Sequence, residues 1–309
     1  MFKMKNKTFL LIIMSLFVLA FMLMGSVSAA DQTITEDNWG GLKEAIEKVG
    51  NGQTVYMENG QYGGENNRNI FIDKNVTISG KGNKVSIYGK GFTIFHINPS
   101  ATVTLKNIKI SNDQISGGRA IANEGTLYLS GCTFTANAYS LGGAIYNKGY
   151  LSVSACTFED NLANYGGAIY NDGNLLISGS TFTNNKAIVY WDKPTQAGYG
   201  GAIYNNGTLS LNTVTFKNNI ARDVYNAIDG SGTITYKNKV TITPVDGTKV
   251  KSVGSGSDIE PNTSPNTGNN NDNYKTIPVK SGMKETGTPL MIILVLLSAL
   301  GLLTCRKQS

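Results

Sequence analysis

Apolar and polar positions alternate with a period of two over most of residues 54–243, which predicts short strands with one apolar face. In the middle of the chain these segments recur about every 24 residues, and about ten extra residues precede the last regular copy. Each strand is too short to bury a core alone. The period therefore predicts that successive segments stack on one another.

A repeated motif fixes the register of these segments. Gly-Gly-Ala-Ile-Tyr-Asn occurs three times, after a degenerate copy at 117–123. The core of the three copies is Gly142, Gly143, Ala144 and Ile145, then Gly166, Gly167, Ala168 and Ile169, then Gly200, Gly201, Ala202 and Ile203. An Asn-x-Gly turn and an apolar alternation follow each copy. A Phe then precedes an Asn by three residues, as in Phe134 and Asn137, Phe158 and Asn161, Phe182 and Asn185, and Phe216 and Asn219.

Stacked copies would place each strand about 4.8 Å from its partner in the next coil. Leu, Ile and Phe would then fill the interior, and Asn side chains would bond to one another and to turn backbone. The sequence thus predicts an all-β, right-handed parallel β-helix of about seven coils over 54–243. We expect the β-helix and its cap to occupy residues 30–245.

An amphipathic helix is predicted at 37–49, before the first coil. Trp39, Leu42, Ile46 and Val49 fall on one face of this helix. An open solenoid end exposes strand edges that would pair with other chains. We therefore expect this helix to be the N-terminal cap.

The two ends carry targeting patterns. Residues 1–29 combine three lysines, an apolar run at 9–24 and a small-x-small site, which predicts a signal peptide; an uncleaved anchor is the alternative. Residues 246–288 read as a disordered polar stalk and 289–305 as a C-terminal transmembrane helix. The basic tail, 306–309, would be cytoplasmic. These features predict a single-pass cell-surface protein with an extracellular solenoid, anchored in the membrane.

Charge and composition exclude several functions. Of the 27 Lys and Arg residues, three lie in the signal and two follow the anchor, which leaves 22 against 21 acids. This balance gives no reason to expect a nucleic-acid partner. His96 is the single histidine, so a histidine-based zinc site is not expected. We expect neither a cofactor nor a metal.

The pairing of Gly-Gly-Ala-Ile with Phe-x-x-Asn resembles the repeat of chlamydial-type polymorphic outer-membrane proteins. The layout of signal, capping helix, pectate-lyase-like solenoid, stalk and short anchor is similar to adhesin-like surface proteins of methanogenic archaea. The resemblance covers about residues 35–245 for the solenoid. It implies adhesion, with surface glycans or proteins of another cell or of the envelope as partners.

An enzyme is the main alternative, because many pectin-lyase-like solenoids are polysaccharide lyases or hydrolases. Such chemistry needs clustered acids. Glu159 and Asp160 are adjacent, so they cannot face the same way on one strand. The variable residues of the Asn-x-Gly turns are Glu124, Lys148, Asp172 and Asn206, which form no acid ladder. We therefore expect a non-catalytic protein, with a structural envelope component as a further alternative.

Two groups of aromatic residues are candidate binding sites. With Ile145, Ile169 and Ile203 inward, a row of Tyr146, Tyr170 and Tyr204 would face outward. This row is either a stacking platform for sugar rings or a ladder that only stabilises the fold. The second group, in the insertion before Gly200, includes Tyr190, Trp191 and Tyr199. The insertion is either a binding loop or a segment folded back over a sheet.

Two cysteines and three sequons remain. Cys132 and Cys156 are one coil apart, in a row with Ser180 and Val214. Export permits a disulfide, whereas an interior row of small residues explains them without one. Glycosylation sequons begin at Asn262, Asn206 and Asn75. Asn262 would be exposed on the stalk and Asn206 in a turn, while Asn75 is the sequon expected to risk burial in a coil.

Overall fold

The computed structural model describes residues 30–112, 114, 117–188, 198–221, 224–225, 227–243 and 251–253. The expected signal peptide at 1–29 and transmembrane helix at 289–305 lie outside these residues, as does the expected stalk apart from 251–253. Within the described ranges, no helix is both long and apolar enough to cross a membrane.

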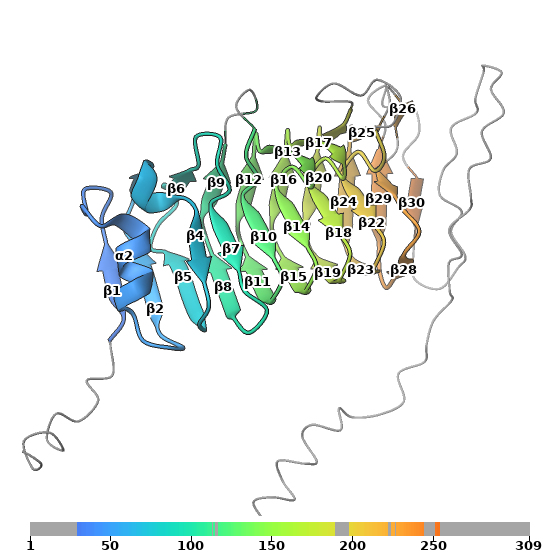
Figure 1. Cartoon of the computed structure of the whole chain (residues 1–309). Helices are drawn as coiled ribbons and strands as arrows, with labels where there is room; N and C mark the ends of the chain where they lie inside the picture. Colours follow the sequence, from blue (N-terminus) through green and yellow to red (C-terminus); the bar gives the residue numbers. More distant parts are fainter. Residues whose placement is uncertain are drawn as a thin grey trace, which may run out of the picture.

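The chain coils into a solenoid with four sheets along its length (Figure 1). Sheet A contains β1 (Gln32–Ile34), β2 (Thr54–Met57), β5 (Val76–Gly80), β8 (Thr102–Lys106), β11 (Thr126–Ser130), β15 (Tyr150–Ser154), β19 (Asn174–Ser178), β23 (Thr208–Asn212) and β28 (Thr233–Tyr236). Sheet B contains β3 (Gly60–Tyr62), β6 (Val85–Tyr88), β9 (Lys109–Ser111), β12 (Thr133–Thr135), β16 (Thr157–Glu159), β20 (Thr181–Thr183), β24 (Val214–Lys217), β29 (Val240–Thr243) and β30 (Lys251–Val253).

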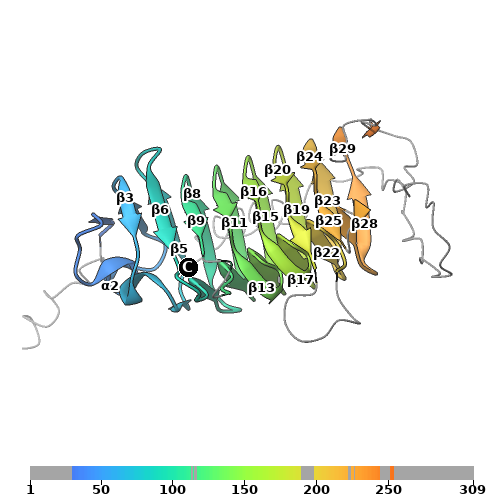
Figure 2. The ribbon, with the colours of Figure 1, turned by 90° about the horizontal axis from the view of Figure 1, so that it is seen from above.

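The other two sheets complete each turn of the solenoid. Sheet C contains β4 (Ile70–Ile72), β7 (Phe95–Ile97), β10 (Ile121–Asn123), β14 (Ile145–Asn147), β18 (Ile169–Asn171), β22 (Ile203–Asn205) and β27 (Ile228–Asp229). Sheet D begins later along the chain, with β13 (Ala138–Leu141), β17 (Leu162–Tyr165), β21 (Lys186–Ala187), β25 (Ile220–Ala221) and β26 (Val224–Tyr225). Seen from above, successive turns lie side by side, with the helix at one end (Figure 2).

The register confirms the predicted ladders. Neighbouring strands pair in parallel, except β25 with β26 and β29 with β30 at the C-terminal end. Phe134, Phe158, Phe182 and Phe216 are successive partners, and Ile110 pairs with Phe134 at the start of that row. The stack has about eight turns, because β2 to β28 contribute eight strands to sheet A. The predicted count of about seven was too low, since the first turns vary in length: Thr54 pairs with Thr77, whereas Val76 pairs with Val103.

The interior is a column of apolar side chains with two asparagine ladders. The four phenylalanine rings stack at 4.9, 4.6 and 5.0 Å between centroids, and each is fully buried. One ladder begins at Asn123, whose Nδ2 donates to Oδ1 of Asn147 at 2.7 Å. The bond repeats from Asn147 to Asn171 and from Asn171 to Asn205. The second ladder joins Asn137, Asn161, Asn185 and Asn219 at 2.9 Å.

The first ladder has a polar end. Asn123 Oδ1 is buried without a hydrogen-bond partner in the described part of the chain. Ile97 holds the equivalent position in the preceding coil, so no amide is there to donate. The amide ladder therefore runs in one direction and starts where the sequence first supplies asparagine.

The repeated motif requires glycine for conformational and steric reasons. Gly166 has φ 63°, a left-handed conformation that other residues adopt at a cost. At Gly167 a Cβ would overlap the carbonyl oxygen of Gly201 in the next coil. The Gly-Gly pair thus permits the close approach of successive turns at the corner between sheets D and C.

The N-terminal cap is shorter than predicted. Helix α2 spans Gly41–Lys48, and the short 3-10 helix η1 (Glu65–Asn67) lies against it. The helix starts at Gly41 because this glycine has φ 56° and its N–H bonds to Asn38, which makes a turn of the preceding residues. Leu42, Ile46 and Val49 are buried as expected, but Trp39 precedes the helix and is 95% exposed, so its placement on the buried face was wrong.

Candidate functional site

The outer face of sheet C carries one side chain from each turn in a single line. Successive partners in this line are Phe71, His96, Ala122, Tyr146, Tyr170, Tyr204 and Asp229. The residues that precede this line in β4 to β22 are buried, so the line faces outward: Ile70, Phe95, Ile121, Ile145, Ile169 and Ile203. We call Phe71 to Tyr204 the aromatic row, with Ala122 as its one non-aromatic position.

Tyrosine rings pack closely in the C-terminal half of the row. The rings of Tyr146 and Tyr170 are 5.4 Å apart, and those of Tyr170 and Tyr204 are 5.3 Å apart. Two further rings join them from the sheet D side: Tyr165 lies 5.2 Å from Tyr204 and stacks on Tyr199 at 5.6 Å. These five residues form the tyrosine cluster, an aromatic surface that spans three turns.

Polar groups fix the edge of the tyrosine cluster. The Tyr146 hydroxyl donates to Asp172 at 3.4 Å. Asn206 Nδ2 donates to both the Tyr170 hydroxyl at 3.0 Å and Asp172 at 3.1 Å. Burial, followed by the charge of Asp172, raises the pKa of Tyr170 to about 12, and burial also raises the pKa of Tyr204. Tyr170 and Tyr204 therefore keep their protons, and both offer ring faces with neutral hydroxyls.

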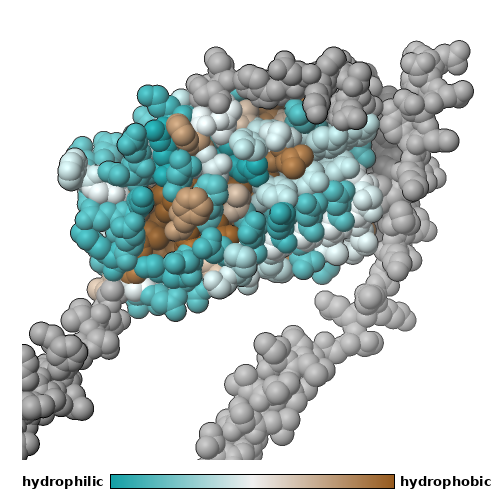
Figure 3. Space-filling view, in the orientation of Figure 1, coloured by the Kyte–Doolittle hydropathy of each residue, from teal (hydrophilic) through white to brown (hydrophobic). Residues whose placement is uncertain are grey.

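The N-terminal half of the row is more apolar. The Phe71 ring is 66% exposed and stacks on His96 at 4.4 Å with an interplanar angle of 10°. Nearby, the Arg68 guanidinium lies 3.9 Å from the centre of the exposed Phe92 ring. In the space-filling view of this face, hydrophobic side chains gather over the N-terminal turns near β4 and β7, and the surface is paler farther along (Figure 3).

Arg119 lies at the interruption of the row. Its guanidinium carbon is 4.0 Å from the Tyr139 ring centre and 5.1 Å from that of Tyr146. Burial lowers the pKa of Arg119, and this guanidinium also lowers the pKa of His96, where burial has the larger effect. Glu124 opposes that shift. The charges of Arg119 and Glu124 therefore act in opposite directions on His96, which is the strand partner of Ala122.

Most of the predicted site residues lie together. The outward row of Tyr146, Tyr170 and Tyr204 is confirmed, and Tyr199 packs against it. Tyr190 and Trp191 lie outside the described residues. Among the sequons, Asn262 is also outside them, while Asn206 is exposed in its turn. Asn75 is exposed as well, so the expected risk of burial was wrong, because Asn75 is the last residue of the turn before β5.

The sequence contained signals for residues that were overlooked. Tyr165 and Tyr199 each directly precede the Gly-Gly pair of their copy, which is the same register position. Phe71 and His96 occupy the tyrosine position in the looser upstream turns, where the motif is absent. Arg119 stands where later copies have the second glycine of the pair. Aligning every turn on the buried position of Ile121, which Ile70 and Phe95 hold in the upstream turns, places all of them.

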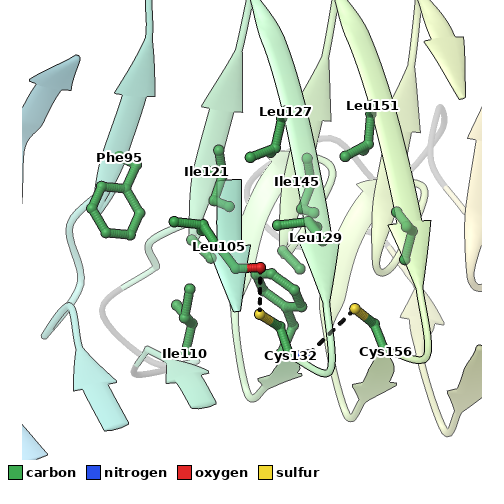
Figure 4. Packing of buried hydrophobic residues seen from close by; sticks show 14 of the residues in the cluster. Phe95, Leu105, Ile110, Ile121, Leu127, Leu129, Cys132, Ile145, Leu151 and Cys156 are labelled. Carbon is green, nitrogen blue, oxygen red and sulfur yellow. Dashed lines mark hydrogen bonds between the residues drawn. The ribbon is translucent and has the colours of Figure 1, made fainter. Parts of the chain in front are cut away.

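The two cysteines of the solenoid are free, buried thiols (Figure 4). Cys132 N–H bonds to Cys156 Sγ at 3.4 Å, and Cys156 N–H bonds to the Ser180 hydroxyl at 3.1 Å. Val214 continues this buried row. The structure thus favours the interior row of small residues over a disulfide. No group of three or more His, Cys, Asp or Glu side chains in the described residues could hold a metal ion.

The architecture defines the class of protein as a parallel β-helix, and a sequence comparison identifies the family. Residues 49–240, more than half of the chain, match the family described as "Right handed beta helix region". The chain belongs to this family. No curated protein and no solved structure matches it.

Proposed function

We propose that this chain is a non-catalytic cell-surface adhesin that holds glycans or other surface partners on the outer face of sheet C. The observation that carries the proposal is the tyrosine cluster, in which Tyr146, Tyr170 and Tyr204 follow one another at successive turns. Partly exposed rings in a line offer stacking surfaces for sugar rings or for partner side chains. The parallel β-helix is compatible with surface binding and with action on polysaccharides.

The polar edge of the cluster favours binding over turnover. Asp229 is the carboxylate beside Tyr204, and Asp172 accepts hydrogen bonds from Tyr146 and Asn206. The counterparts of Asp172 in the flanking turns are Lys148 and Asn206, so the charge does not repeat from turn to turn. A glycosidase or lyase would need acids held in a pair or around a cation.

Cell-surface display is part of the proposal and rests on the sequence. The leader pattern at 1–29, the polar stretch at 246–288 and the apolar run at 289–305 support export followed by anchoring, with the solenoid outside the cell. Surface glycans or proteins would then be the partners within reach of the row.

The test combines a glycan array with an assay for released sugar ends on the same polysaccharides. We expect binding without release, and a loss of at least tenfold in affinity for Tyr170→Ser, because tenfold corresponds to about 1.4 kcal/mol of lost contact. Tyr128→Ser is the matched control, since Tyr128 is 42% exposed on sheet A, away from the row. Sugar release would instead favour a lyase or hydrolase. A protein that neither binds nor cleaves, but is abundant in the envelope, would favour a structural role.

A further inference from the structure

We propose that the aromatic row selects ligands that carry an anionic group, and that Arg119 binds this group at the interruption marked by Ala122. The inference rests on the proposed function and names the class of ligand that the aromatic row would prefer. It starts from a change in the repeat, because the position that Arg119 holds is glycine in the three later copies: Gly143, Gly167 and Gly201.

The later turns leave no space for a side chain at this position. At Gly143 and Gly167 a Cβ would overlap backbone carbonyl oxygens of the neighbouring coil or of sheet D. Beside Arg119 the chain is arranged differently, because Gly118 forms an antiparallel bridge with Ala138 of β13, the first strand of sheet D. The Arg119 side chain lies over Tyr139, an exposed residue of that strand.

The contacts of Arg119 leave its charge unmatched. Its guanidinium is held by the Tyr139 and Tyr146 rings, and in the described part of the chain it makes no ion pair. A cation over an aromatic face gains about 0.5–2 kcal/mol, whereas taking a charge out of water costs several kcal/mol. Burial lowers the pKa of Arg119, which is the direction expected of a guanidinium that lacks an anion.

The surroundings of Ala122 favour an anion from outside. Lys148, which lies 5.5 Å from the Tyr146 ring centre, is exposed and adds a second positive charge. Glu124 is the opposing carboxylate, and it is exposed to solvent in its turn. Ala122 has no ring, so a ligand lying along the row would come closest to the backbone here, between His96 and Tyr146.

The chemical class follows from the guanidinium and the rings together. A planar guanidinium pairs with carboxylate and sulfate through two parallel hydrogen bonds. Aromatic faces on both sides of the interruption suit the flat faces of sugar rings. The ligand we infer is an acidic glycan that carries a carboxylate or a sulfate, with its charged unit over Ala122 and neighbouring units over Tyr146 and Tyr170.

The experiment compares three probes on the full chain: a uronic-acid oligosaccharide, the same oligosaccharide with its carboxylates methyl-esterified, and a sulfated oligosaccharide. Wild-type protein should bind at least one acidic probe tenfold or more tightly than the ester, and added salt should shrink this preference. The preference should disappear in Arg119→Gln. The preference should persist in part in Arg119→Lys, which keeps the charge but loses the two parallel N–H donors of the guanidinium.

Lys217→Gln is the matched control, because Lys217 is an exposed cation on sheet B and its loss should leave the preference unchanged. Equal binding of ester and acids by the wild type would overturn the inference while leaving the proposed function intact. A preference that survives in Arg119→Gln would also overturn it. If no probe binds even to the wild type and the array is empty, the proposed function fails as well. The salt dependence of the wild type provides a test that does not require any variant to fold.

Discussion

The first three turns and the turns from β11 onward build the same solenoid by different means. In the later turns identical residues stack: phenylalanine on phenylalanine and asparagine on asparagine. In the first turns the apolar character repeats more often than the residue itself, as when Ile78 pairs with Leu105. Both regions have fully buried interiors. The comparison shows that apolar periodicity suffices for the coil, and that the ladders add a way to satisfy polar groups inside it.

The outer faces of the two regions differ in the same manner. The aromatic row consists of Phe71 and His96 in the first turns and of tyrosines in the later turns, with Ala122 between them. Repetition in the later turns gives three equivalent tyrosines that share polar neighbours, whereas the first turns give a single exposed pair. A binding surface that extends over several units is therefore expected of the regular region.

The largest expected effect comes from breaking an asparagine ladder. Asn161→Ala removes the acceptor of Asn137 N–H and Nδ2, and it removes a donor to the Phe134 carbonyl. Each buried polar group left without a partner costs about 1–3 kcal/mol, so we expect a loss of about 2–5 kcal/mol in the free energy of unfolding. Denaturant titration measures it. The control Asn174→Ala, at an exposed position, should cost far less; similar costs for the two would contradict the role of the ladder.

Adding a methyl group to a glycine should have different effects in the regular turns and in the first turn. Gly167→Ala should destabilise by about 1–3 kcal/mol or more, because its Cβ would overlap backbone of the next coil rather than a side chain that can move. Gly63→Ala, in the first turn, has open space and should be neutral or stabilising by about 0.4–1 kcal/mol. Thermal unfolding of both variants gives the answer. Equal shifts in the unfolding temperatures of the two variants would mean that the corner between sheets D and C is not tightly packed.

A smaller effect of opposite sign is expected at Thr213. This β-branched residue has φ 54° in the turn where the three other regular copies place Gly131, Ala155 and Gly179. The left-handed conformation costs about 1–2 kcal/mol outside glycine, so Thr213→Gly should stabilise the protein by about 0.5–1 kcal/mol after the entropy of glycine is counted. Thr181→Gly, in strand β20, should destabilise it instead. The same sign for both substitutions in denaturant unfolding would refute the conformational argument.

The smallest effect concerns acid pH in the first turns. The pKa of folded His96 is lowered, first by burial and then by Arg119, so the unfolded chain binds the proton more readily. Stability should therefore fall as pH drops below the ordinary histidine pKa of about 6.5 and level off below the folded value. In His96→Phe this part of the pH dependence should vanish, which unfolding curves at about pH 8 and about pH 5 would detect as a difference from wild type. Parallel curves for the two proteins would show that His96 does not titrate as inferred.

The sequence predicted the regular region well because its motif is dense. Gly-Gly-Ala-Ile and Phe-x-x-Asn gave the strand register, the inward phenylalanines and the outward row of Tyr146, Tyr170 and Tyr204. The predicted number of turns was too low because the first turns vary in length and share only apolar alternation. Trp39 was misplaced because helical periodicity does not reveal the turn that Asn38 and Gly41 form.

The part of the site that escaped prediction depends on where a sheet starts. Nothing in the periodicity indicates that sheet D begins at β13, or that Gly118, next to Arg119, pairs antiparallel with Ala138 of this strand. The contacts of Tyr165 and Tyr199 likewise depend on the corner between sheets D and C. Packing across a corner joins residues that a repeat alignment treats as separate columns.

Mass spectrometry of tyrosine nitration, with and without the oligosaccharide best bound on the array, tests the central claim most directly. We predict that the ligand protects Tyr146, Tyr170 and Tyr204, while exposed Tyr128 on sheet A reacts equally in both samples. Unchanged nitration of the three row tyrosines in the saturated complex, or protection of Tyr128 in their place, would contradict it.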